Sequence, residues 1–460
     1  MNIDSTPLDF EIRRVLDSDF KPSFLNYTGQ FKVGEDSFDI IRITDIDIES
    51  DYELTYGPVI MLRVVMMLGD YTAKIFPNQD TLEFILKTER VDPVSRDSDP
   101  EEGSVTTRTY TVSLDPKARP FMSEDNNAET LSQDTQNLLN FVEVDLQLKP
   151  KLLDDISKVT VGGNFIDTTN ADLLKDLITY YCQQMELDDD EKLLGVEMNG
   201  TVSDVVRKNV GLYHGLPLSD LADYLQTKTG GIYPSGLAHF VHERSWYVYP
   251  PYDTTGFDEA KEKIIIISVP AKRYPQVEKT YLTENGITTI LATGNKKIVS
   301  DKSAIRDNAG NGIMFADANK MVSGFAKEDG NVAVIKRGEN TSEFVGEQAP
   351  NGKNNVKLLP ERITSNPFVA RTRLARSQGH TYMIEWENAD PDIIKPGLNV
   401  KIMYLDDGEV KTIDGVLNKC HRQTKMTGKG LMSNGYRSFC VLVVFVKANP
   451  GEDVGSLGLD

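Results

Sequence analysis

The sequence contains few cysteines and no long hydrophobic run. Only three cysteines, Cys182, Cys420 and Cys440, occur among 460 residues, and no two of them have the spacing of a zinc knuckle or a redox motif. We therefore expect reduced thiols in a protein that folds in the cytosol. The longest apolar stretch, residues 59–68, includes Arg63 and is much shorter than the ~20 residues that cross a bilayer. The first residues also lack the basic and apolar regions of a signal peptide, which predicts no membrane partner.

Positive charge is scarce as well. The chain has 50 Lys and Arg against 70 Asp and Glu, which gives a formal net charge of −20 at pH 7. Because contact with nucleic-acid phosphates requires clustered Lys and Arg, this balance argues against a nucleic-acid-binding surface. The hydrophobic fraction of 39% is that of a slightly polar globular protein, and 460 residues suffice for two or three domains.

Catalytic motifs are missing from the sequence. It contains no Gly-x-Ser-x-Gly elbow, Walker loop or complete dinucleotide fingerprint. The nearest approach to a metal motif is His239, His242 and Glu243, but zinc proteases place two histidines four residues apart around a Glu on a helix. Here the flanking residues favour an extended chain, where positions three apart face opposite sides. Ordinary polar positions beside an interface remain the simpler alternative to a metal site, and we predict no catalytic, cofactor-binding or metal-binding residue and no cofactor.

Aromatic and β-branched residues dominate the stretch from 245 to 294. Runs of such residues bounded by Pro and Gly predict strands, and four consecutive isoleucines at 264–267 predict a strand that is buried on both faces. An unpaired charge there would cost several kcal/mol, roughly the stability of a domain, so we expect Ile265→Asp to abolish folding.

Two sets of side chains are predicted to form interfaces. The aromatic residues combine an apolar body with a polar tip, which suits anchors between subunits or domains. The arginines concentrate positive charge in an acidic chain, either as a solvated face or as a patch that meets an acidic surface on a neighbouring copy. The predicted interface residues are Trp246, Tyr247, Tyr249, Tyr252, Arg371, Arg373 and Arg376.

Strand signals occupy both ends of the chain and helical signals the middle. Short turn-bounded strands near residues 31–115, including 71–76, predict a small antiparallel barrel or sandwich, and strands resume from residue 368. Apolar residues with a 3.6-residue period predict helices at 170–185, with Asn170 as N-cap, and at 217–229. The expected fold class is therefore mainly β (α+β), with two small antiparallel β-barrels and an intervening α+β region.

The composition divides the chain into five parts. Residues 294–364 are rich in Gly, Asn, Asp and Lys, and residues 448–460 are too rich in Gly to fold alone. The predicted parts are an N-terminal β-barrel at 1–118, a middle α+β region at 119–293, a connector or insertion at 294–364, a C-terminal β-barrel at 365–447 and a flexible tail at 448–460.

Three passages carry a resemblance to a known family. Residues 59–86 contain a Gly-Asp turn and the run Ile-Phe-Pro-Asn-Gln-Asp-Thr-Leu, and residues 216–294 join the helix Leu-Ser-Asp-Leu-Ala-Asp-Tyr-Leu to the strand Trp-Tyr-Val-Tyr-Pro. Residues 373–417 include Ile-Lys-Pro-Gly-Leu-Asn-Val-Lys-Ile and Asp-Gly-Val-Leu. In this layout the chain resembles the baseplate (tail) hub proteins of contractile-tailed bacteriophages and, more distantly, the hub part of type VI secretion spike proteins.

The resemblance implies a structural virion protein and no enzyme. It implies a hub-type tube fold and a homotrimeric ring of two-barrel subunits in the tail baseplate, assembled in the host cytoplasm, which joins the tail tube protein to the spike protein and contacts other baseplate proteins. DNA would then be only passing cargo, because an acidic lumen removes favourable phosphate contacts. The alternatives are another virion structural protein, such as a baseplate wedge, tail terminator or capsid decoration protein, and an enzyme with a dispersed site, such as a glycan hydrolase or peptidase.

Overall fold

A computed structural model of the chain gives the fold. Its described residues are 7–18, 24–91, 105–114, 141–189, 191–269, 279–292, 296–299, 314–317, 327–329, 332–334, 343–348, 356–364, 372, 375–376, 379–406, 409–426 and 435–447.

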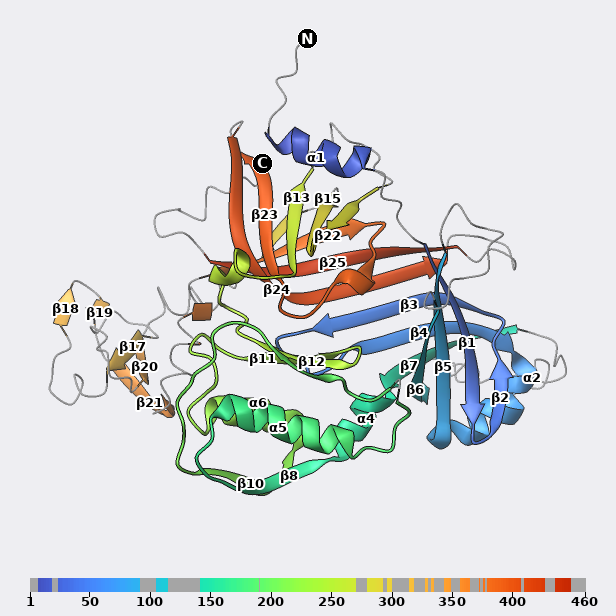
Figure 1. The fold of residues 1–460 in the computed structure, drawn as a ribbon, viewed down its shortest axis with the longest axis horizontal. Coiled ribbons are helices and arrows are strands. Elements are labelled where there is room, and N and C mark those ends of the chain that lie inside the picture. The colour runs from blue at the N-terminus through green and yellow to red at the C-terminus, as the bar shows by residue number, and fades with distance from the viewer. Residues whose placement is uncertain are drawn as a thin grey trace, which may run out of the picture.

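One sheet of 15 strands runs through most of the molecule (Figure 1). Seven of its strands come from the N-terminal third of the chain: β1 (Phe24–Val33), β2 (Asp36–Asp39), β3 (Arg42–Asp51), β4 (Val59–Met67), β5 (Leu82–Val91), β6 (Val105–Leu114) and β7 (Phe141–Pro150). The others are β13 (Lys263–Ser268), β14 (Tyr281–Glu284), β15 (Ile287–Ala292), β16 (Lys296–Val299), β22 (Gly379–Glu387), β23 (Asn399–Asp406), β24 (Glu409–Met426) and β25 (Tyr436–Lys447). The mainly β class predicted from the sequence is confirmed.

The sheet follows a single path with one branch. Its order is β14-β15-β13-β23-β24-β3-β4-β7-β6-β5-β1-β2, and β25, β22 and β16 branch from β24. β13 pairs in parallel with both β15 and β23, so strands of the middle and C-terminal regions share one sheet. Among the described strands no ladder closes either half into a ring, so the two closed barrels are not found. The proposed domain boundaries stay predictions.

Strands β3 and β24 join the two halves of the sheet. They pair antiparallel from Lys419 opposite Asp51 to Lys425 opposite Asp45. Lys419 contacts Glu49, and His421 Nε2 lies 2.6 Å from Asp47 Oδ1 across the same ladder. Partly exposed ion pairs contribute little stability, typically below about 1 kcal/mol each. Opposite charges facing one another do disfavour a shifted register, so they help to align the halves.

Each half has its own hydrophobic core. The N-terminal core contains Phe31 and Phe84, whose rings meet edge to face with centroids 5.1 Å apart. The C-terminal core contains Trp386 and the isoleucines Ile264 and Ile266 of β13. The same strand turns Ile267 toward a separate cluster under α1 (Pro7–Asp17), where Ile265 is only partly buried. The prediction of a strand covered on both faces is confirmed, with Ile265 as its least covered isoleucine.

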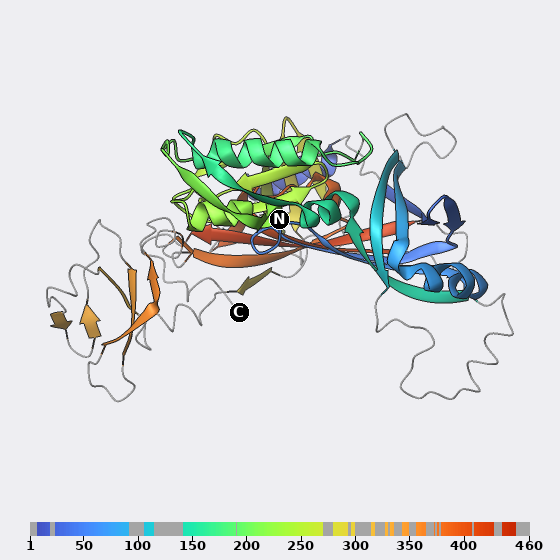
Figure 2. The same cartoon turned by 90° about the horizontal axis from the view of Figure 1, so that it is seen from below.

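A layer of helices and short strands lies over one face of the sheet (Figure 2). It has a third core, around Leu174, Leu221 and Trp246. Its elements are α4 (Lys151–Lys158), β8 (Thr160–Phe165), α5 (Asn170–Gln183), β9 (Gly195–Met198), β10 (Val210–Pro217), η4 (Leu218–Asp220), α6 (Leu221–Thr227), β11 (Ala238–His242), β12 (Ser245–Tyr249) and η5 (Thr255–Phe257). No helix among the described residues is long and apolar enough to span a membrane.

The helix predicted from residue 170 forms, but its cap is different. Thr169, not Asn170, is the N-cap of α5, and its hydroxyl accepts a hydrogen bond from the Asp172 amide at 3.0 Å. The buried Asn170 amide instead donates to the carbonyls of Thr229 and Gly231 at 3.3 and 2.9 Å. Asn170 therefore ties the end of the α6 segment to the start of α5.

Residues 71–76 are not a strand, contrary to the prediction. The chain leaves β4 through three short helical segments, α2 (Leu68–Asp70), η1 (Tyr71–Ile75) and η2 (Phe76–Thr81). Tyr71 and Ile75 are both buried at helical spacing, and Lys74 pairs with Asp70 at 2.7 Å. The aromatic and β-branched residues there fit either period, and contact with the N-terminal core selects the helical one.

Short elements complete the described chain. They are β17 (Met314–Asp317), β18 (Lys327–Asp329), β19 (Val332–Val334), β20 (Glu343–Gln348), β21 (Val356–Thr364) and η6 (Pro391–Ile393). β17, β20 and β21 form one small sheet and β18 and β19 another, so the segment predicted as a connector contains strands.

Candidate functional site

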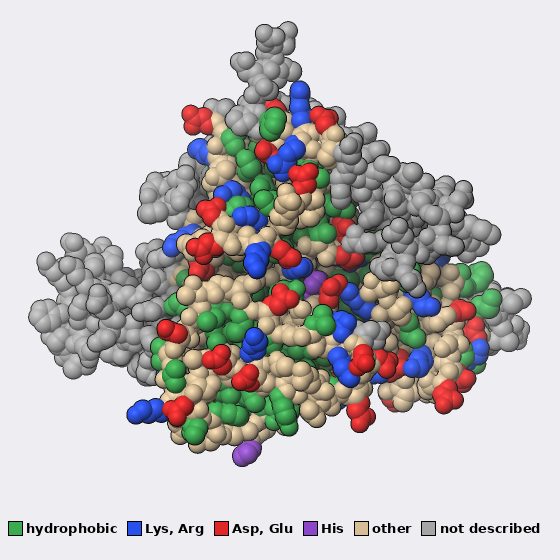
Figure 3. All heavy atoms as spheres, in the orientation of Figure 1, with side chains coloured by type: hydrophobic (Ala, Val, Ile, Leu, Met, Phe, Trp, Pro, Cys, Tyr) green, Lys and Arg blue, Asp and Glu red, His purple; other side chains and the backbone are tan. Residues whose placement is uncertain are grey.

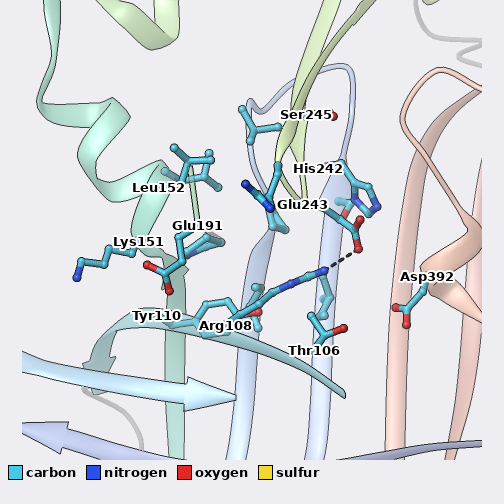
Figure 4. Close-up of a pocket in the computed structure, with 18 of the residues that line it drawn as sticks. Thr106, Arg108, Tyr110, Lys151, Leu152, Glu191, His242, Glu243, Ser245 and Asp392 are labelled. Atoms are coloured by element: carbon cyan, nitrogen blue, oxygen red, sulfur yellow. Dashed lines mark hydrogen bonds and ion pairs between the residues drawn. The ribbon is translucent and has the colours of Figure 1, made fainter. Parts of the chain in front are cut away.

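A cavity of about 510 Å³ lies where the two halves of the sheet meet the α+β layer (Figure 4). Strand β6, the start of α4, the turn between β11 and β12, and strand β24 all contribute to its wall. Its polar lining residues include Arg108, Tyr110, Lys151, Glu191, His242, Glu243, Arg244, Asp392 and Arg422. Segments more than 300 residues apart in the sequence therefore meet in one space.

Pro150 determines the shape of one wall. β6 pairs with β7 only from Tyr110 onward, where Tyr110 lies opposite Pro150. Proline has no amide hydrogen for a ladder, and the chain turns there into α4. Residues 105–109 of β6 consequently have β5 on one side and the cavity on the other.

An ion pair spans the cavity rim. Arg108 on β6 donates to Glu243 Oε1 at 2.6 Å, as Figure 4 shows. Glu243 occupies the tight turn between β11 and β12 with a φ of 55°. The Arg108 side chain remains 46% exposed, so its guanidinium can donate to a second acidic partner.

His242 lies beside this ion pair and is neutral at physiological pH. Burial lowers the pKa of His242 to about 4, although Glu243 opposes the shift. Burial likewise raises the pKa of Tyr247, on the adjacent strand, to about 12. Neither side chain therefore changes charge near pH 7, and the arrangement suits recognition better than proton transfer.

Arg422 forms the deeper cationic part of the wall. Its side chain is 12% exposed and contacts Asp392 Oδ1 at 3.3 Å and Thr424 Oγ1 at 3.1 Å, and it also donates to the Tyr27 hydroxyl. The cavity has four Lys or Arg residues, three Asp or Glu residues and a neutral histidine. Figure 3 shows both signs interspersed over the outer face of the molecule. A local charge near +1 in a chain of net charge −20 favours a neutral or acidic ligand.

The four predicted aromatic anchors are buried inside the chain. Trp246 is fully buried in the core of the α+β layer and stacks on His239 with ring centroids 5.8 Å apart. The Tyr249 hydroxyl donates to the Tyr52 carbonyl at 3.3 Å, and Tyr247 is 6% exposed.

Tyr252 contacts the turn that follows β3 and strand β25. Its hydroxyl donates to Glu53, and its ring meets Phe445 edge to face at 5.0 Å. The predicted anchor role thus takes the form of contacts between segments of one chain, because no aromatic face of this group is left on the surface.

The arginine prediction is only partly covered by the structure. Arg376 is described, its side chain is 59% exposed, and it lies 3.7 Å from Glu53. Arg371 and Arg373 lie outside the described residues. An intersubunit role for the three arginines stays a prediction.

The histidine cluster lies on an extended strand, as predicted. His239 and His242 belong to β11, where His239 packs on Trp246 and His242 lines the cavity. Within the part of the chain that the structure describes, no group of three or more His, Cys, Asp or Glu side chains is placed to hold a metal ion.

No pattern in the sequence predicts the cavity itself. Arg108 and Glu243 are 135 positions apart, so no local pattern relates them. Pro150 by itself predicts only a turn. The order of strand β7, Pro150 and helix α4 could have suggested that the β7 ladder ends early. It could not have shown that β6 is the strand left with an unpaired edge.

Solved structures that match the chain include tail and secretion-system proteins. The 43 kDa tail protein of prophage MuSo2 from Shewanella oneidensis is 10% identical, with 91% of this chain and 98% of that chain covered and a TM-score of 0.44. A component of the E. coli type VI secretion system, described as structurally similar to two T4 bacteriophage tail proteins, is 8% identical over 91% of this chain and 77% of that chain, with a TM-score of 0.40. A PdpA–VgrG complex is 9% identical over 94% of this chain and 68% of that chain, also with a TM-score of 0.40.

The resemblance is a distant one. The matching structures belong to the two classes named from the sequence, phage tail proteins and type VI secretion proteins. No protein-family model and no curated protein matches the sequence.

Proposed function

We propose that this chain is a structural hub of a phage-type tail baseplate. In this proposal three copies form a ring that joins the tail tube protein to the spike protein, contacts other baseplate proteins and lets DNA pass. The protein would be located in the tail baseplate of the virion after assembly in the host cytoplasm. The role is that of an adaptor and not of an enzyme.

The division of the sheet into two joined halves is the observation that carries the proposal. Seven strands lie on one side of the β3–β24 ladder and the others on the opposite side, and each half has a core of its own. Three such chains would supply six β units around a ring. A threefold assembly could thereby present sixfold-like contacts on one face, which is the requirement for an adaptor between parts of different symmetry.

The charge of the chain is compatible with passage of DNA. A channel lining as acidic as the chain, whose net charge is −20, would offer few favourable phosphate contacts to retain a nucleic acid. The ladder between the halves is fixed by interstrand hydrogen bonds along seven residue pairs, so each subunit would act as one rigid wall segment.

Sedimentation equilibrium of the purified chain tests the oligomeric state. We expect the mass of three chains, and electron microscopy of the same sample should show a threefold ring with a central channel. A monomer at every accessible concentration, without binding to a tube or spike protein, would contradict the proposal. Location away from the tail axis in the assembled particle would instead indicate a wedge, terminator or decoration protein.

Charge reversal tests the predicted arginine contact. Arg376→Glu should weaken the trimer, because the exposed guanidinium would no longer meet an acidic surface of the neighbour. Arg437→Glu is the matched control, since Arg437 is also exposed but lies on β25 outside the predicted patch. Equal behaviour of both variants would remove Arg376 from the interface while leaving the ring itself to the mass measurement.

A further inference from the structure

Strand β6 exposes backbone groups to the cavity. Residues 105–109 pair with β5, whereas β7 reaches only as far as Tyr110. Within the described part of the chain no other strand pairs with this edge. Open edges are usually protected by Lys, Pro or a bulge, but the sequence here is Val-Thr-Thr-Arg-Thr and Val105 is 46% exposed.

The direction of these backbone groups follows from one hydrogen bond. The Thr109 amide donates to Glu191 Oε1 at 3.1 Å, so it points away from β5 and into the cavity. Because backbone groups of a strand alternate between its two sides, the amides and carbonyls of Thr107 and Val105 point the same way. Glu191 already acts as an acceptor at one position of this row, and two positions remain for a ligand.

The cavity next to this edge has the size and lining of a binding site. Its volume of about 510 Å³ lies within the usual range for ligand pockets. Leu152, Leu153 and Ile394 supply an apolar floor, and Arg108 remains accessible at the rim. Figure 4 shows the Arg108 side chain extending toward Glu243 along the rim.

We propose that this cavity binds an extended peptide segment of a partner protein. The segment adds as a strand to residues 105–109 of β6, places an apolar side chain against Leu152 and carries an acidic side chain opposite Arg108. An extended peptide is the ligand that matches backbone donors and acceptors repeated at every second residue, and the local charge near +1 favours the acidic side chain. This site stands independently of the hub proposal, because it concerns one subunit only.

Peptide selection on the full-length chain is the direct experiment. A displayed library of random heptapeptides is the probe, and the best peptide is synthesised for calorimetry. Thr107→Pro removes the outward amide, and proline is tolerated at an edge position whose amide faces away from the ladder. We expect it to weaken binding about tenfold, whereas the matched Thr107→Val retains the amide and binds normally. Arg108→Gln should abolish the preference for an acidic residue in the selected peptides.

Amide hydrogen exchange provides a second readout that needs no variant. Bound peptide should slow exchange at Val105 and Thr107 about tenfold or more while leaving Thr106, which faces β5, unchanged. This measurement decides the question even if Thr107→Pro fails to fold. No enriched peptide, equal binding to Thr107→Pro, or binding without protection of these two amides would each overturn the proposal. Failure here would leave the trimer measurement unaffected.

Discussion

Two adjacent isoleucines of strand β13 should differ clearly in the stability that is lost when each is truncated. Ile266 is fully buried in the C-terminal core, between β15 and β23, whereas Ile265 on the opposite face is only partly covered. Truncating a fully buried isoleucine to alanine costs about 2–5 kcal/mol, since the lost transfer energy adds to the cavity that remains. The partly covered neighbour should lose roughly 1 kcal/mol.

Urea unfolding of Ile266→Ala and Ile265→Ala measures this difference directly. With a total stability of about 5–15 kcal/mol, the first variant should have a clearly lower midpoint and the second a small shift. The aspartate pair extends the test: Ile266→Asp should not fold, while Ile265→Asp should be less damaging than the sequence alone suggested, because its carboxylate can reach water. Equal losses for the two alanine variants, or a well-folded Ile266→Asp protein, would refute this placement of β13.

Three further predictions concern helix capping, pH and thiol chemistry. Thr169→Ala should lower the free energy of unfolding by about 1 kcal/mol, measured in urea, because it removes the cap of α5; Thr169→Ser should restore it. The lowered pKa of His242 means that the unfolded chain binds more protons between pH 6.5 and 4, so stability should fall as the pH drops through that window, and His242→Gln should reduce the slope of urea midpoint against pH. All three cysteines are buried, and burial raises the pKa of Cys182 to about 12, so a thiol reagent should label them only after denaturation; rapid labelling of the native protein would contradict their burial.

Local periodicity predicted the elements whose environment is simple. The predicted helices form over 170–183 and 218–227 because their apolar residues repeat at helical spacing. The isoleucine strand forms at β13 because consecutive β-branched residues favour a strand. Residues 71–76 fit two patterns, and the prediction there was wrong. The predicted N-cap was wrong by one residue because Thr and Asn are both common N-caps. The choice depends on the folded chain, which places the Gly231 carbonyl where the Asn170 side-chain amide donates to it.

Residue patterns along the chain determined the mainly β class and the absence of catalytic motifs from the sequence, and the composition determined the acidic charge. Tertiary structure decided which strands became neighbours. The β3–β24 ladder joins positions about 370 residues apart, and the pairing of Arg108 with Glu243 depends on a turn and a strand that share no local pattern. Side-chain periodicity specifies which face of a strand is buried, but the partner of each edge depends on where the rest of the chain leaves space. For this reason the open edge of β6, created by Pro150 at the end of β7, is a property of the folded molecule.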